Sequence, residues 1–269
     1  MARKREKRKE ISQILKKTLL FIIKIPYFII KGIINLIKKI NEKAEKSRVA
    51  KKREGMKSIY EELELIKKIE GDFNDFIKKL YSSESQIGMI IGARGTGKTA
   101  VGLKILENAH AKYNRKCYAI GFKEEEMPLW IKVISDVSGI ENNSFVLIDE
   151  GGVLFSSRES MTNANKILSK LILISRHKNL TIVFISQNSS NLEINVLRQA
   201  DFLILKQSSL LQKEFERRIV QKIYDGISDY FKKFEDIKGV SYVYSGKFKG
   251  FLSNKLPSFW KTSISKSFR

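Results

Sequence analysis

The chain has 269 residues, of which 42% are hydrophobic, and its formal net charge is +22. This length allows one large domain or two small ones with a sizeable core. Cys117 is the only cysteine and His110 and His177 are the only histidines, which excludes an intramolecular disulfide and a Cys/His zinc cluster. A reducing compartment such as the cytoplasm fits this cysteine usage.

The positive charge is concentrated at the two ends of the chain. Residues 1–57 hold 19 Lys and Arg against five Glu, and residues 247–269 hold six Lys and Arg and no acidic residue. The stretch between them is nearly neutral. Basic ends favour polyanionic partners, here double-stranded DNA or an anionic membrane surface on the inner face of the cell membrane.

Residues 1–57 are predicted to form a basic, amphipathic helical region around the apolar run 19–37. Four lysines recur there every seven residues: Lys17, Lys24, Lys31 and Lys38. At roughly 100° per residue they fall on one stripe of a helix. Three placements stay open, namely a helix lying in the membrane interface, a membrane span, or docking on protein. Both flanks are basic, so the positive-inside rule gives a span no preferred orientation.

The rest of the chain divides into a helical connector (58–85), an α/β domain (86–253) and a basic tail (254–269). Apolar residues in the connector recur at helical spacing. The domain alternates strands and helices, which is typical of a mainly parallel sheet with helices on both faces. Strands are expected at 87–91, 117–122, 145–149, 181–186 and 202–205, helices at 100–106, 128–134, 163–176 and 210–234, and a closing hairpin at 240–244 and 248–252.

A glycine-rich motif stands between a predicted strand and a predicted helix. Residues 92–99 read Gly-Ala-Arg-Gly-Thr-Gly-Lys-Thr, a complete phosphate-binding loop. Its glycines let main-chain N–H groups point at phosphate oxygens, and the helix adds its positive end. The motif predicts a site for ATP and Mg²⁺, in which Lys98 reaches the β- and γ-phosphates and the hydroxyl of Thr99 binds the metal. The residues expected around the nucleotide are Gly92, Ala93, Arg94, Gly95, Thr96, Gly97, Lys98, Thr99 and Ala100.

Two later strands end in polar residues that we expect at the same site. The strand 145–149 ends in Asp149, and Glu150 follows it. Asp149 is placed to hold Mg²⁺, usually through water, and Glu150 to orient and deprotonate an attacking water. The strand 181–186 is followed by Gln187, whose amide is placed to sense hydrolysis or to position that water. These residues together predict hydrolysis with water as the nucleophile.

The phosphate loop, the Leu-Ile-Asp-Glu strand end and the run from Arg176-His177 through a strand to Gln187 resemble the FtsK/HerA superfamily of nucleic-acid motors. Within it, the pattern is similar to viral genome-packaging ATPases and to the zonula occludens toxin group, which includes membrane-bound assembly ATPases of filamentous phages. The resemblance covers residues 86–224. It implies a RecA-like P-loop NTPase fold of the ASCE class.

The same resemblance implies a homo-oligomeric ring, usually a hexamer. In such a ring an arginine of one subunit touches the γ-phosphate bound by its neighbour. Arg176 is the first candidate for this role and Arg158 the second. Three later arginines are further candidates: Arg198, Arg217 and Arg218.

Three functions are compatible with these residues. The first is an ATP-driven motor that moves DNA during viral genome packaging or a related transfer, with its basic ends on DNA or on capsid or portal protein. The second is a membrane-anchored assembly or secretion ATPase, which the N-terminal region favours. The third is a tether that binds nucleotide without hydrolysing it, and Glu150 together with the intact Lys98-Thr99 pair argues against it.

Overall fold

The computed structural model describes residues 31, 35–82, 84–149, 161–192 and 194–265. The chain divides into two compact units, Met1–Lys52 and Arg53–Arg269. In the first unit, residues 35–52 are helical and nearly all exposed. No helix within these described ranges is long and apolar enough to cross a membrane. Most of the apolar run at 19–37 lies outside them.

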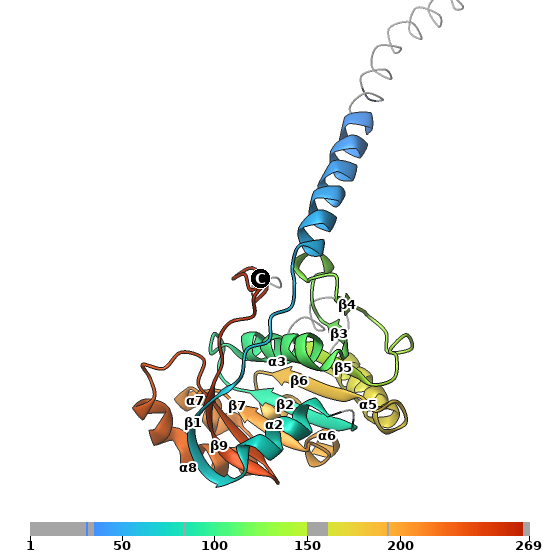
Figure 1. Ribbon diagram of the computed structural model, residues 1–269. Helices are drawn as coiled ribbons and strands as arrows, with labels where there is room; N and C mark the ends of the chain where they lie inside the picture. The colour runs from blue at the N-terminus through green and yellow to red at the C-terminus, as the bar shows by residue number, and fades with distance from the viewer. Residues whose placement is uncertain (1–30, 32–34, 83, 150–160, 193, 266–269) are drawn as a thin grey trace, which may run out of the picture. The chain divides into compact units, whose positions relative to one another are not determined.

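The second unit is built on a sheet that counts nine strands within the described residues (Figure 1). Their order is β1-β9-β8-β7-β2-β6-β5-β3-β4. The six strands from β7 to β4 run parallel, and β8, β9 and β1 extend the sheet with antiparallel pairs. The strands are β1 (Glu64–Gly71), β2 (Gln86–Ile91), β3 (Lys116–Ile120), β4 (Ile131–Val133), β5 (Ser144–Asp149), β6 (Thr181–Ser186), β7 (Phe202–Leu205), β8 (Ser241–Ser245) and β9 (Phe248–Ser253).

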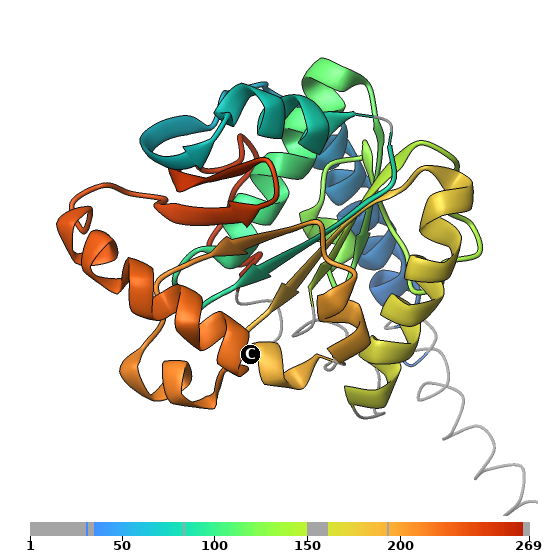
Figure 2. The same ribbon diagram turned by 90° about the horizontal axis from the view of Figure 1, so that it is seen from below.

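Helices cover both faces of this sheet (Figures 1 and 2). One apolar cluster joins α2 (Phe73–Tyr81) and α3 (Lys98–Tyr113) to one face. A second joins α5 (Met161–Lys178), α6 (Ile194–Arg198) and α8 (Arg218–Lys233) to the other. Strands β2, β5 and β6 are apolar runs buried almost throughout, as expected of strands covered on both sides. The predicted α/β fold, with a mainly parallel sheet between helices, is confirmed.

Parts of two predicted helical segments form strands instead, whereas α2 (Phe73–Tyr81) lies in the predicted connector as a helix. Residues 64–71 of the predicted helical connector form strand β1, which pairs antiparallel with β9. Their apolar residues fit helical spacing, but the open edge of β9 offers main-chain partners that override this local preference. The predicted helix 128–134 contains strand β4, in which Ile131 pairs with Cys117 of β3. Short apolar runs suit either structure, and only the neighbouring strand decides between them.

The single helix predicted at 210–234 is divided into α7 (Leu210–Phe215) and α8. The two residues between them bond instead to the loop that follows β6. The buried carboxylate of Glu216 accepts a hydrogen bond from the main-chain N of Ser189 at 2.7 Å. The Nε of Arg217 donates to the main-chain O of Ser189 at 3.0 Å. These contacts end one helix and fix the start of the next.

Residues 254–264, predicted as part of a basic tail, pack against α3. Phe259 and Ile264 are buried in the same apolar cluster as that helix. The main-chain N of Ser258 donates to Oε2 of Glu107 at 3.1 Å. Glu107 is fully buried and pairs with Lys104 Nζ at 2.9 Å. A charged pair on α3 therefore anchors the chain after β9.

Candidate nucleotide-binding site

The structure brings the phosphate loop, Asp149 and Gln187 to the carboxyl edge of the parallel sheet. Strand β2 leads into the loop and α3, β5 ends at Asp149, and β6 ends just before Gln187. Strand β6 lies between β2 and β5, and its last residue, Ser186, pairs with Ile91 of β2. Ligands of parallel α/β sheets bind outside this edge of the strands. The three predicted parts of the site therefore share one location.

The loop backbone adopts conformations that favour glycine. Gly97 has a φ of +87° and is the N-cap residue of α3. A Cβ atom on Gly92 would lie 2.5 Å from the Cβ of Lys206, so the loop passes too close to that residue for any side chain. The first N–H groups of a helix have no acceptors within the helix. The turn therefore offers donors to an anion at the start of α3.

The Lys98 side chain lies back on the phosphate loop and is only 8% exposed. Its Nζ donates to the main-chain O of Gly92 at 2.8 Å and of Ala93 at 2.9 Å. Main-chain carbonyls are weaker partners for an ammonium group than charged oxygens are. A triphosphate in the loop would supply such oxygens, which fits the role predicted for Lys98. Arg94, by contrast, is exposed.

Thr99 and Asp149 form the candidate metal site. The Thr99 hydroxyl donates to Oδ2 of Asp149 at 3.1 Å. Mg²⁺ takes oxygen ligands and is held by one or two protein groups together with substrate phosphates. A hydroxyl and a carboxylate in contact, beside a phosphate cradle, are a donor set that fits this ion.

Two of the predicted catalytic residues, Glu150 and Arg158, lie outside the described residues. Arg176 is exposed near the C-terminal end of α5, and that end leads into the start of β6. The five steps between the six residues of β6, at about 3.3 Å each, place the start of β6 roughly 17 Å from the edge that carries the loop. Arg176 is thus not brought to the phosphate loop of its own chain. Arg217 is bonded within the chain, to Ser189 and Leu192.

Gln187 is exposed and is tied through its main chain to helix α7. Its carbonyl O accepts a hydrogen bond from Nε2 of Gln212, and the same Nε2 lies 3.0 Å from Oε1 of Glu216. Glu216 in turn accepts from Ser189, two residues after Gln187. The segment after β6 is therefore connected to the α7–α8 junction. Sequence reasoning missed Gln212 and Glu216 because both fell within one predicted helix.

Sequence reasoning also missed Lys206, which is 1% exposed and follows β7 directly. Its main-chain N donates to the O of Ile91 at 2.8 Å, and the O of Gln207 accepts from the N of Ala93 at 3.0 Å. The extension of β7 thus holds the first residues of the phosphate loop. A lysine after an apolar strand is an ordinary pattern, so no sequence signal distinguishes this one.

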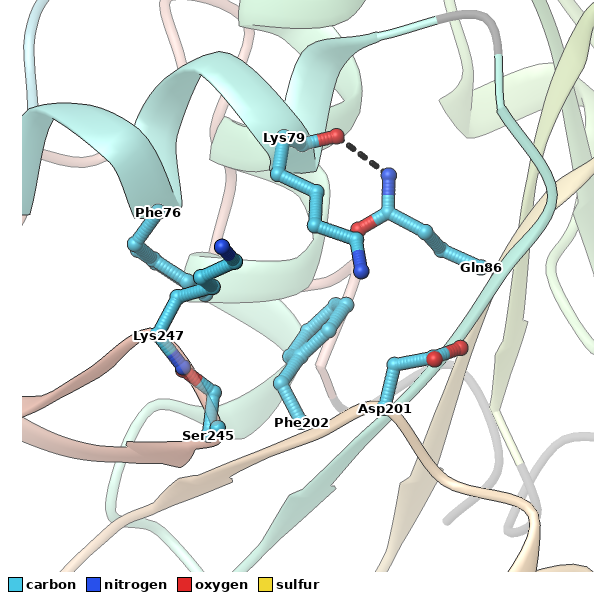
Figure 3. Close-up of a pocket in the computed structure, with 8 residues that line it drawn as sticks. Phe76, Lys79, Gln86, Asp201, Phe202, Ser245 and Lys247 are labelled. Atoms are coloured by element: carbon cyan, nitrogen blue, oxygen red, sulfur yellow. Dashed lines mark hydrogen bonds between the residues drawn. The ribbon is translucent and has the colours of Figure 1, made fainter.

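A pocket of about 260 Å³ lies at the other edge of the sheet, where β2 and β7 begin (Figure 3). Lys79, Gln86 and Asp201 are among the side chains that line it. Gln86 donates to the main-chain O of Lys79, and Asp201 accepts from the N of Ile87 at 2.8 Å. These polar groups bond to the main chain where α2 ends and β2 begins. The pocket is distinct from the candidate nucleotide site.

A family model described as Zonular occludens toxin (Zot) matches residues 119–203. This segment runs from β3 to β7 and includes Asp149, Arg176 and Gln187. The predicted resemblance to the zonula occludens toxin group is thereby confirmed over these residues, and the phosphate loop precedes them. Among the curated proteins, none matches the chain in sequence.

Several solved structures are similar to this chain. The DNA-packaging ATPase of Sulfolobus turreted icosahedral virus has 14% identity, with a TM-score of 0.42 over 65% of this chain and all of that one. The genome packaging NTPase of Sulfolobus turreted icosahedral virus 2, in complex with AMPPCP, has 14% identity and a TM-score of 0.43, over 65% of this chain and all of that one. The pCW3 conjugation coupling protein TcpA, with ATPγS, has 15% identity and a TM-score of 0.44, over 69% of this chain and 64% of that one.

Proposed function

We propose that this chain is a Mg²⁺-dependent ATPase that works as a motor. The observation that carries the proposal is the phosphate loop at the start of α3, with Lys98 buried on it and Thr99 bonded to Asp149. A buried cation, a row of helix N-terminal donors and a metal-type oxygen pair at one sheet edge suit a nucleoside triphosphate. This arrangement also favours hydrolysis over mere storage, because Asp149 is followed by a second acid.

In the proposed reaction, the loop amides and Lys98 bind the β- and γ-phosphates and offset the charge that develops as the phosphoryl group leaves. Thr99 and Asp149 hold Mg²⁺, which when bound neutralises phosphate charge. Glu150 accepts a proton from the attacking water. An arginine of a neighbouring subunit, with Arg176 as the first candidate, stabilises the transferred group.

The proposed link to movement begins at Gln187. A displacement of Gln187 on phosphate release would pull on Gln212 through the main-chain carbonyl of Gln187. It would also shift Ser189, which is bonded to Glu216 and Arg217. Helix α8 begins at Arg218, directly after Arg217. These contacts therefore support a path from the nucleotide to that helix.

A ring of identical subunits is part of the proposal. A group of apolar side chains after β7 is strongly exposed: Leu210 (87%), Leu211 (75%), Phe215 (69%) and Ile219 (59%). All four lie within residues 210–219, and exposed apolar side chains that lie together mark interaction surfaces. They follow the strand that supports the phosphate loop, and an arginine acting in trans requires a second copy close to that edge. We therefore assign this surface to a neighbouring subunit.

The proposed cargo is double-stranded DNA, moved in viral genome packaging or a related transfer. The basic ends of the chain support a polyanionic partner. The alternative is a membrane-anchored assembly or secretion ATPase, favoured by the amphipathic pattern in residues 1–57 and by the Zot match. In that case the basic N-terminal region binds anionic lipid.

The deciding experiment is ATP turnover of the full chain at low salt, with and without double-stranded DNA. We expect DNA to stimulate turnover, and we expect Glu150→Gln to bind ATP without releasing phosphate. Liposome flotation of the full chain and of a chain lacking residues 1–52 separates the alternatives. Turnover that ignores DNA, together with flotation that requires residues 1–52, would support the assembly ATPase. A chain that retains no nucleotide would refute both.

A further inference from the structure

We propose that the buried ammonium of Lys206 is a second cation of the nucleotide site, which supports the phosphate loop from below and makes nucleotide binding depend on pH. The inference rests on the proposed function, because it requires phosphates in the loop. Lys206 is a positioning residue in this proposal, since the loop backbone stands between it and the nucleotide.

The Lys206 side chain runs beneath two glycines of the loop, Gly92 and Gly97. A Cβ atom built on Gly92 would lie 2.5 Å from Lys206 Cβ, and one built on Gly97 would lie 4.0 Å from Lys206 Cε. The side chain therefore extends from the first glycine of the motif towards the last. Because neither glycine has a side chain, little more than a layer of backbone separates this lysine from the phosphate position.

The Lys206 ammonium has hydrogen-bond acceptors but no counter-charge among the described residues. Its Nζ donates to the main-chain O of Gly239 and of Val240, both at 2.9 Å. In the described part of the chain, no carboxylate lies within 4.0 Å of this Nζ. A buried ammonium held by carbonyls alone is costly, so an anion nearby would stabilise it.

The titratable groups that the described residues bring into contact with Lys206 and its main chain do not supply that anion. The loop contributes Lys98, which is itself a cation. Helix α8 contributes Tyr224, whose hydroxyl donates to the main-chain O of Lys206 at 2.9 Å. Strand β8 contributes Tyr242, which pairs with Leu205. Burial raises the pKa of both tyrosines, so they are neutral at physiological pH.

The position of Lys206 has a consequence for proton binding. Burial lowers the pKa of Lys206 to about 7, so the free protein holds this group partly neutral at pH 7 to 8. Phosphates above the loop favour the charged form and raise that pKa. By linkage, nucleotide binding then takes up a proton at Lys206, and nucleotide affinity falls as the pH rises above 7.

Lys206 also connects the loop to the antiparallel part of the sheet. The carbonyls of Gly239 and Val240 belong to the turn that leads into β8. Gly239 has a φ of +79°, and a Cβ there would lie 2.2 Å from the O of Asn254, so the turn is fixed against the chain after β9. Loss or gain of the Lys206 proton therefore acts on a rigid support of the phosphate loop.

Titration calorimetry of the full-length wild-type chain with Mg·ADP tests the inference without any variant. At pH 7.5 we compare two buffers that differ in ionisation enthalpy, and we repeat the binding at pH 6.5 and pH 9. We expect uptake of about half a proton or more, and a roughly tenfold loss of affinity between the two pH values for each unit by which phosphate raises the pKa of Lys206. Binding without proton uptake and with constant affinity would overturn the inference. A wild-type chain that binds no nucleotide would instead refute the proposed function.

Three variants locate the proton. Lys206→Arg keeps the charge at every pH and should bind Mg·ADP with little pH dependence. Lys206→Met should bind more weakly than wild type at pH 6.5, but about equally at pH 9. The control is Lys79→Met at the opposite edge of the sheet, which should keep the wild-type pH profile. If both Lys206 variants keep that profile, the proton binds elsewhere and the inference fails.

Discussion

The two edges of the parallel sheet both hold a buried cation, but they are built in opposite ways. At the carboxyl edge, Lys98 bonds to the main chain of its own loop, at Gly92 and Ala93. At the amino edge, Arg115 is 5% exposed and bonds to parts of the chain that are far apart in sequence. The partners of Lys98 are local, and in the proposed site phosphate oxygens take their place.

The Arg115 guanidinium joins the ends of several elements. It donates to the O of Asn143 at 2.7 Å, the O of Ser144 at 2.9 Å and Oγ1 of Thr181 at 3.2 Å, and also to the O of Ser82. These acceptors lie at the starts of β5 and β6 and at the end of α2. The planar fork of an arginine suits several fixed acceptors at once. A buried cation with such partners stabilises the fold, whereas the role proposed for Lys98 requires phosphate oxygens to replace its local partners.

The substitution expected to have the largest effect is Lys98→Ala at the carboxyl edge. We expect kcat/KM for ATP to fall about 100- to 1000-fold, because one preorganised cation is lost from the phosphates. The free energy of unfolding without nucleotide should change by only about 1 kcal/mol. Steady-state phosphate release and urea unfolding measure the two quantities. Lys78→Ala, at an exposed site on α2, serves as the control, and a Lys98→Ala chain with near wild-type turnover would contradict the assignment.

At the amino edge, Arg115→Met should show the reverse pattern. The carbonyls of Asn143 and Ser144 lose their donor, and each unsatisfied buried acceptor costs about 1–3 kcal/mol. We expect the free energy of unfolding to fall by about 3 kcal/mol, with nucleotide affinity unchanged wherever the variant is folded. Urea denaturation checks this, and the exposed neighbour Lys116→Met is the matched control. A loss of nucleotide affinity without a loss of stability would mean that the two edges are not independent.

The meeting of the candidate site residues at the carboxyl edge could be predicted, because these residues lie in short, recognisable stretches of sequence. The phosphate loop is eight consecutive residues, and Asp149 and Gln187 each follow directly after an apolar strand. Strand direction then places them together, since parallel strands end at a common edge. The buried strands were predictable for a similar reason, because each is a continuous apolar run.

The amino edge and the support beneath the loop could not be predicted, because their partners are distant in sequence. Arg115 meets Thr181 across 66 positions, and Lys206 meets Val240 across 34. Strand β1 was mistaken for a helix for the same reason, since Glu64 pairs with Ser253. The sequence around a single arginine, a lysine or a short apolar run does not indicate which distant residues it contacts.

The smallest expected effects come from one substitution made at both edges, Thr99→Val and Thr181→Val. Valine keeps the shape of threonine and removes the hydroxyl. Thr181 is fully buried, and Thr181→Val removes one of the acceptors of Arg115. The free energy of unfolding should therefore fall by about 1 kcal/mol, with ATP turnover unchanged. At Thr99 the lost hydroxyl is a metal ligand in the proposed site, so turnover should fall and need more Mg²⁺ for half-maximal rate, with stability nearly constant. Magnesium titrations of phosphate release and urea unfolding of both variants test this. Equal effects of the two variants on turnover would show that the hydroxyl of Thr99 serves the fold rather than the metal.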